Sequence, residues 1–121
     1  MEEMVQEMIR LRVASDEGMT IATIVESDIV DAAVVRQLGE ELCRLADEAG
    51  STIIILDCRK VRYISSAALN KLIVFRKRVV GAGGQLVLCR LRPAISEVFR
   101  VTRLNQMFNI ERDHLAARKC V

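Results

Sequence analysis

The sequence predicts a small α/β fold with a mixed, mostly parallel sheet of four to five strands, an N-terminal hairpin, and helices packed mainly on one face. Two observations support this prediction. Strand patterns alternate with helix patterns along the chain, and the four branched apolar residues at 53–56 end at Asp57, as in a strand buried on both faces. Hydrophobic residues make up 51% of the 121 positions and aromatic residues only 3%, so the core must consist of Val, Ile, Leu and Ala. This length suits one ordinary domain.

The first part of the chain shows a hairpin followed by a helix. Residues 9–15 and 19–25 have strand patterns, and an Asp-Glu-Gly turn lies between them. Asp28 or Asp31 then caps a helix that Gly50 ends. The apolar stripe of this helix is Val34, Val35, Leu38, Leu42, Leu45 and Ala46.

A second helix is predicted from about residue 66 to 80, after the buried strand at 52–57. One side of its helical wheel carries Leu69, Leu72, Ile73, Val79 and Val80. The glycine-rich segment 81–84 comes next. A phosphate-binding loop follows a strand, precedes a helix and needs a Lys-Ser/Thr pair, whereas this segment follows a helix and precedes a strand. It therefore indicates a helix stop and a tight turn.

The last part of the chain continues the alternation. Residues 85–89 form another short buried strand, and Pro93 suits the first turn of a third helix. A final short strand within 104–110 and a frayed terminal helix or tail at 111–121 complete the pattern. We treat residues 1–121 as a single domain in which residues 1–8 are an N-terminal extension.

Composition argues against several function classes. The net charge of +2 is too small to indicate nucleic acid as a partner, and no aromatic residues interleave with the basic ones. No apolar run approaches the roughly 18 residues that a membrane span requires. The acidic N-terminal residues lack the apolar region of a signal peptide, so we expect a cytoplasmic protein with no direct membrane insertion. Paired carboxylates and nucleophile–base pairs are not recognisable, so we expect no enzyme and no catalytic residue.

Cysteine and histidine spacing gives no metal-binding motif. The four cysteines are Cys43, Cys58, Cys89 and Cys120. They form no CxxC pair and have no neighbouring histidine, so we expect no metal site and no cofactor. Cys58 and Cys89 follow strand-like runs and are expected to be buried, reduced thiols. His114, the single histidine, is expected at the surface of a polar tail, without a carboxylate or nucleophile that would suggest a triad.

The start of the second helix is the candidate functional site. Ser65 and Ser66 precede its apolar stripe, where free backbone N–H groups and the positive end of the helix dipole favour a hydroxyl or a phosphate. Two serines at this position can act as a helix cap, as an anion site or as a phosphorylation switch.

Residues from about 9 to 115 resemble the STAS domain and, within it, the bacterial anti-sigma factor antagonists. In that family a hydrophobic strand ending in "LDL" or similar precedes a variable loop and an aromatic-apolar-Asp-Ser-Ser/Thr-Gly-Leu segment. The corresponding segment here runs from Ile54, within the strand at 52–57, through Tyr63 to Leu69. Aligning Leu69 with the family's leucine places Ser66 on the serine that a partner kinase phosphorylates. Ser65 then replaces the aspartate, and Ala67 and Ala68 replace the Ser/Thr-Gly pair.

The resemblance implies a small STAS-like fold and a non-enzymatic regulatory module, a monomer or weak dimer. Its partner would be an anti-sigma factor with serine-kinase activity, and a serine phosphatase would reverse phosphorylation on Ser66, with Ser65 as second choice. The expected partner-binding residues are Asp28, Ser65, Ser66, Ala67, Asn70, Lys71 and Val74. The missing aspartate and glycine support an alternative, a non-phosphorylated STAS scaffold subunit of a sensory (stressosome-like) or transport complex.

Overall fold

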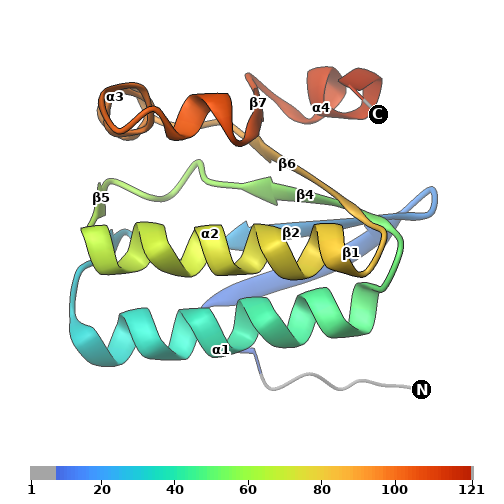
Figure 1. Ribbon diagram of the computed structural model, residues 1–121, viewed down its shortest axis with the longest axis horizontal. Coiled ribbons are helices and arrows are strands. Elements are labelled where there is room, and N and C mark those ends of the chain that lie inside the picture. Colours follow the sequence, from blue (N-terminus) through green and yellow to red (C-terminus); the bar gives the residue numbers. More distant parts are fainter. Residues whose placement is uncertain (1–7, 121) are drawn as a thin grey trace.

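The computed structural model describes residues 8–120 (Figure 1). In chain order its elements are β1 (Leu11–Asp16), β2 (Met19–Ile24), β3 (Asp28–Ile29), α1 (Ala32–Ala49), β4 (Ile53–Asp57), β5 (Tyr63–Ile64), α2 (Ser66–Gly81), β6 (Gln85–Cys89), α3 (Pro93–Val101), a short 3-10 helix (Leu104–Gln106), β7 (Asn109–Glu111) and α4 (His114–Cys120). Strands and helices alternate as the sequence predicts.

The main sheet has five strands in the order β1-β2-β4-β6-β7. The β1–β2 hairpin is antiparallel, and the remaining neighbours are parallel. The predicted mixed sheet with an N-terminal hairpin is thus confirmed. β4 is its middle strand, and Ile54, Ile55 and Leu56 are 0% exposed, as expected from an unbroken apolar run.

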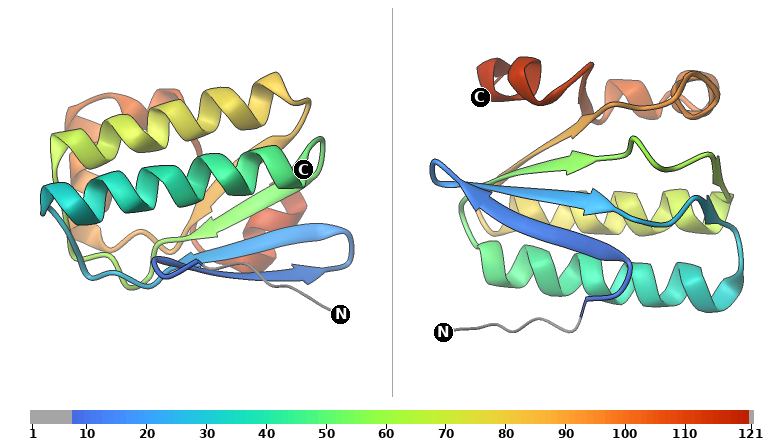
Figure 2. Two further views of the ribbon diagram at one scale, coloured as in Figure 1. Left: turned by 90° about the horizontal axis from the view of Figure 1, so that it is seen from below. Right: turned by 180° about the vertical axis from the view of Figure 1, so that it is seen from behind.

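Helices α1 and α2 lie side by side over one face of this sheet (Figures 1 and 2). Their apolar sides and that face form the main core, which includes Leu38, Leu42, Leu72 and Phe75. The terminal helix α4 covers part of the opposite face, where Ala117 packs with Ile55, Val87 and Cys89. The two long helices therefore share one face, and within residues 8–120 the short terminal helix is the element that covers the other.

The predicted helix boundaries have direct local causes. Asp31, not Asp28, caps α1, because its carboxylate accepts the N–H groups of Ala33 and Val34 at 2.9 and 3.4 Å. Gly50 ends α1 with a φ of 61°, a conformation that glycine adopts without steric cost. In the turn after α2, a Cβ at Gly84 would lie 2.6 Å from the carbonyl oxygen of Thr52. That position therefore requires glycine, and the glycine-rich segment is the predicted turn.

Glu41 of α1 fixes the beginning of β1. Its side chain is 5% exposed, and its carboxylate accepts the backbone N–H groups of Ile9, Arg10 and Leu11 at 3.0, 2.9 and 3.1 Å. Hydrogen bonds to a charged acceptor are stronger than those between neutral groups. These three bonds tie the segment that enters β1 to α1.

Three structural details differ from the sequence-based expectations. A two-stranded parallel sheet of β3 and β5 was not predicted. The last strand begins only at Asn109, because residues 104–106 form the short 3-10 helix. Val80 is 51% exposed, since Val79 takes the buried side of the last turn of α2.

Of the predicted N-terminal extension, residues 1–7 lie outside the described part, and Met8 packs against the core. Among residues 8–120, no helix has the length and apolar character to cross a membrane.

Candidate functional site

The two serines at the start of α2 have different environments. Ser65 is the N-cap, and its Oγ accepts the N–H of Ala68 at 3.1 Å. Its own N–H donates to the carbonyl of Ile29 at 3.0 Å, which holds the cap against the end of β3. Ser66 is the first residue of the helix and is exposed, and its Oγ has no hydrogen-bonding partner among the described residues. The hydroxyl of Ser66 is therefore available at the surface, whereas that of Ser65 serves as a cap.

The small β3–β5 sheet places the predicted loop residue Asp28 beside this helix start. Asp28 pairs with Tyr63 in a parallel register, and the N–H of Arg62 donates to the carbonyl of Ser27 at 2.8 Å. The carboxylate of Asp28 is exposed and accepts the hydroxyl of Ser27 at 2.9 Å. As a result, the loop before α1 and the loop before α2 form one continuous surface.

The other predicted contact residues extend this surface along α2. Ser66, Asn70 and Val74 are exposed and spaced by four residues, which places them on one side of the helix. Lys71 is half-buried against α1, where a Cβ at Gly39 would lie only 2.7 Å from its Cδ. An open hollow of about 300 Å³ between the two helices is lined by Gly39, Glu40, Cys43, Lys71, Val74 and Arg78. The sequence-predicted residues are thus contiguous.

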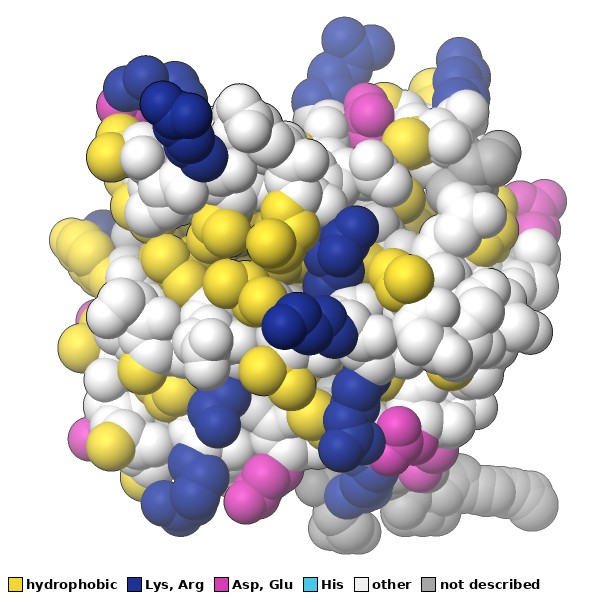
Figure 3. All heavy atoms as spheres, in the orientation of Figure 1, with side chains coloured by type: hydrophobic (Ala, Val, Ile, Leu, Met, Phe, Trp, Pro, Cys, Tyr) yellow, Lys and Arg dark blue, Asp and Glu magenta, His cyan; other side chains and the backbone are white. Residues whose placement is uncertain are grey.

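Two apolar side chains near the site were not among the predicted contacts. Val30 is 56% exposed and Tyr63 is 58% exposed, and both lie in or next to the small sheet. The guanidinium carbon of Arg62 lies 6.0 Å from the centroid of the Tyr63 ring. In Figure 3, hydrophobic side chains gather between α2 and α3, and Lys and Arg side chains are scattered over α1 and α2. A signal for Tyr63 existed, because it is the only tyrosine and occupies the aromatic position of the family's segment.

The helix start can accept negative charge. Ser65 already uses two N–H groups of the first turn: the N–H of Ala68 donates to Ser65 Oγ, and the N–H of Leu69 donates to the Ser65 carbonyl. The N–H groups that precede them lie next to the Ser66 side chain. The first turn of α2 contains no acidic residue, and the first N–H groups of a helix carry its positive partial charge. A phosphate on Ser66 would therefore be compatible with the folded domain.

Comparison with known proteins identifies the family. Residues 10–117 match the model of the STAS domain. The chain belongs to the STAS domain family. A Bordetella bronchiseptica protein provisionally named anti-sigma factor antagonist BtrV is 32% identical over 109 residues, which cover 90% of this chain and 91% of that protein. The chain is accordingly a STAS domain of the anti-sigma factor antagonist family, as the resemblance predicts.

Solved structures show the same fold. A STAS domain protein described as an anti-sigma factor antagonist, from Planctomyces limnophilus, matches with a TM-score of 0.78 and 19% identity, covering 88% of this chain and 93% of that one. The Bacillus cell fate determinant SpoIIAA in its phosphorylated form matches with a TM-score of 0.65 and 12% identity, covering 92% and 99%. At these identities the likeness concerns the fold alone.

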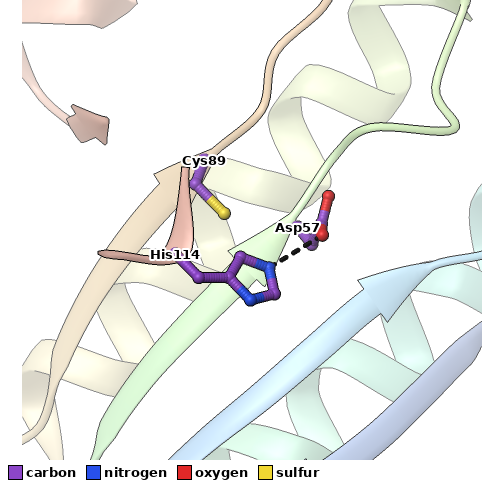
Figure 4. A group of neighbouring side chains, drawn as sticks. All are labelled: Asp57, Cys89 and His114. Atoms are coloured by element: carbon purple, nitrogen blue, oxygen red, sulfur yellow. Dashed lines mark hydrogen bonds and ion pairs between the residues drawn. The ribbon is translucent and has the colours of Figure 1, made fainter. Parts of the chain in front are cut away.

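The STAS domain also contains a cluster of Asp57, Cys89 and His114 (Figure 4). His114 is partly exposed, but the expectation that it has no carboxylate near it is wrong. Its Nε2 lies 2.8 Å from Oδ2 of Asp57, and its side chain is 31% exposed. Spacing could not reveal this contact, since 57 residues separate the partners and α4 must fold back across the sheet to form it.

The predicted burial of two cysteines is confirmed. Cys58 is 3% exposed and Cys89 is 0% exposed, and the described cysteines form no disulfide. Burial raises the pKa of Cys58 well above its ordinary value. Burial, aided by the nearby charge of Asp57, raises the pKa of Cys89 to about 12. Both thiols are therefore protonated and poorly nucleophilic at neutral pH.

Proposed function

We propose that this STAS domain is a non-enzymatic anti-sigma factor antagonist that is switched by phosphorylation on Ser66. Its unphosphorylated form binds an anti-sigma factor with serine-kinase activity and so releases a sigma factor. Phosphorylation ends the binding, and a serine phosphatase restores it. The name of the Bordetella relative and the phosphorylated state of the SpoIIAA structure support this proposal.

The environment of Ser66 carries the proposal. A kinase must reach the serine hydroxyl and align it with the phosphate of its nucleotide. Ser66 is exposed and its Oγ has no partner among the described residues, whereas the Oγ of Ser65 would have to leave the N–H of Ala68. Ser66 is accordingly the acceptor, and Ser65 positions the helix that presents it.

The contact surface centres on this serine. It combines Ser65, Ser66, Ala67, Asn70, Lys71 and Val74 of the α2 region with Asp28 of the adjoining loop. A phosphate carries about −1.5 to −2 charges, which water solvates in the free domain. Binding would move that charge beside Ala67 and near Val74 and would remove its water, so the cost falls on the complex and not on the fold.

Labelling with the cognate kinase and ATP tests the acceptor. We expect full phosphorylation of the wild type and of Ser51→Ala, and none of Ser66→Ala, as measured by intact mass and peptide mapping. Ser51 is a suitable control, since it is exposed and lies beside Gly83 at the far end of α2. The 16 residues of α2 separate it from Ser66 by about 24 Å. Labelling of Ser66→Ala at the wild-type level would contradict the assignment.

Titration calorimetry with the anti-sigma factor tests the switch. Ser66→Asp should weaken binding at least about tenfold, whereas Ser51→Asp adds the same charge away from the surface and should bind as the wild type does. If Ser66→Asp binds normally and Ser66 is never labelled, the serine is not a switch. The function of this domain would then be that of a non-phosphorylated scaffold subunit.

A further inference from the structure

Three potential metal ligands meet where the parallel strands end. Asp57 is the last residue of β4, Cys89 is the last residue of β6, and His114 is the first residue of α4 (Figure 4). Their Oδ, Sγ and ring-nitrogen atoms all lie within 4.8 Å of one another. From this geometry we propose that Asp57, Cys89 and His114 form a binding site for a divalent transition-metal ion, with Zn²⁺ as its best fit.

Each ligand has the atom it needs available. Oδ1 of Asp57 accepts the N–H of Arg59 at 2.8 Å, and Oδ2 of the same carboxylate faces His114. Coordination through Oδ2 would leave the Arg59 hydrogen bond intact, as outer partners commonly orient a ligand. Sγ of Cys89 points toward the other two side chains in Figure 4. The sulfur of Cys58 does not take part, because it lies 3.8 Å from the carbonyl of Leu56 and packs in the main core.

The three ligand atoms, all within 4.8 Å of one another, would have to move by about 1 Å or less to reach the spacing of a tetrahedral zinc site. Zinc–ligand bonds of about 2.0–2.3 Å place neighbouring ligand atoms about 3.4–3.6 Å apart. The imidazole and carboxylate, now 2.8 Å apart, would separate by about 0.6 Å when zinc binds between them. Nε2 would coordinate the ion without a proton, and the neutral imidazole would carry its one proton on Nδ1. His114 begins a short helix and is partly exposed, so a small rotation of its ring suffices.

The ligand set favours zinc among common divalent ions. A thiolate, an imidazole and a carboxylate together suit Zn²⁺ better than Mg²⁺ or Ca²⁺, which prefer oxygen ligands. The thiol proton of Cys89 would pass to solvent on binding. Since the His114 side chain is 31% exposed, a water molecule can reach the fourth position. The ion would join α4 to the ends of β4 and β6.

Arg90 opposes the ion and provides a distinctive test. Its guanidinium lies 3.6 Å from Oδ2 of Asp57, and its side chain is 40% exposed, which leaves it room to move toward solvent. A cation near the carboxylate lowers the affinity for a second cation. Arg90→Gln should therefore bind zinc more tightly than the wild type, a result that a purely structural hydrogen bond between Asp57 and His114 would not produce.

Cobalt substitution tests the site in the full chain. We expect one Co²⁺ per chain, with a thiolate-to-cobalt charge-transfer band and the strong visible bands of tetrahedral coordination, and displacement by Zn²⁺. Cys89→Ser should abolish the charge-transfer band, and His114→Ala should lower the affinity at least about tenfold. Cys58→Ser and Cys120→Ser should keep both properties. Zinc should raise the melting temperature of the wild type but not of Cys89→Ser.

The proposal is overturned if the wild type binds no Co²⁺ at a one-to-one ratio. It is equally overturned if folded Cys89→Ser keeps the charge-transfer band, or if Arg90→Gln and His114→Ala bind as the wild type does. Circular dichroism checks that each variant is folded. If Cys89→Ser does not fold, His114→Ala and Arg90→Gln decide the matter, since both side chains are partly exposed.

Discussion

Replacing Ser65 and Ser66 separately should distinguish the helix cap from the free hydroxyl. Ser65→Ala removes the oxygen that accepts the N–H of Ala68 at 3.1 Å, a loss of about 1 kcal/mol for an N-cap. The unfolding entropy is about 2.1 cal/mol/K per residue, or about 0.25 kcal/mol/K for this chain of 121 residues. The melting temperature of Ser65→Ala should therefore fall by about 4 °C.

Substitutions at Ser66, unlike Ser65→Ala, should leave the melting temperature nearly unchanged or raise it. Ser66→Ala breaks no hydrogen bond with a described residue, so the free energy of unfolding should change by less than about 0.5 kcal/mol, or about 2 °C. Ser66→Asp places a carboxylate at the positive end of α2 and should add about 0.3–1 kcal/mol, a rise of about 1–4 °C. Salt screens that interaction, so the gain should shrink at high ionic strength.

Differential scanning calorimetry at low salt measures these differences. Asp31→Ala is the matched control, because Asp31 caps α1 in the same way and its loss should also cost about 1 kcal/mol. If Ser66→Ala melts several degrees lower while Ser65→Ala is unchanged, Ser66 is the cap. In that case the distinction between the two serines, on which the acceptor assignment rests, is wrong.

Two further predictions concern buried groups. Glu41→Ala should lower the free energy of unfolding in urea by about 3 kcal/mol or more, because three backbone N–H groups lose a charged acceptor; a loss below 1 kcal/mol would contradict the anchoring role. In the presence of a chelator, a chromogenic thiol reagent at pH 8 should modify exposed Cys120 rapidly and Cys58 and Cys89 slowly. With its pKa at about 12, Cys89 is almost entirely protonated at that pH and should react faster as the pH rises. If more than two thiols of the folded protein react in the fast phase, at least one of Cys58 and Cys89 is not protected as the structure indicates.

Local signals explain why much of the fold could be predicted from the sequence. The short apolar run of β4, bounded by polar residues, is typical of a strand that is covered on both faces. Gly50 and Pro93 mark the end of α1 and the beginning of α3, since the conformation each favours is the one found there. The position of Ser66 at a helix start follows from the same kind of reasoning.

Features that depend on distant contacts could not be predicted. β3 and β5 have two residues each, too few for any periodicity, and their pairing with the backbone bonds beside it places Asp28 near the serines. Sequence alone could not decide whether Asp28 or Asp31 caps α1, or whether Ser65 or Ser66 caps α2. Both members of each pair have a side chain suited to capping, and the backbone conformation decides which one does so. The contact between Asp57 and His114 requires α4 to cross the sheet, which no short segment encodes.

The loop between β4 and α2 explains how the C-terminal ends of the sheet strands can support the serine site. It begins at Asp57, whose Oδ1 accepts the N–H of Arg59. Backbone hydrogen bonds then fix the loop: the N–H of Cys58 donates to the carbonyl of Cys89, and the N–H of Val61 donates to the carbonyl of Cys58. The small sheet and the cap of α2 complete the series. The position of Ser66 is therefore set by the domain itself. In the proposed function a partner would meet a loop that is already hydrogen-bonded within the domain, which lowers the ordering cost of binding, and a charge at Ser66 would lie directly on the contact surface.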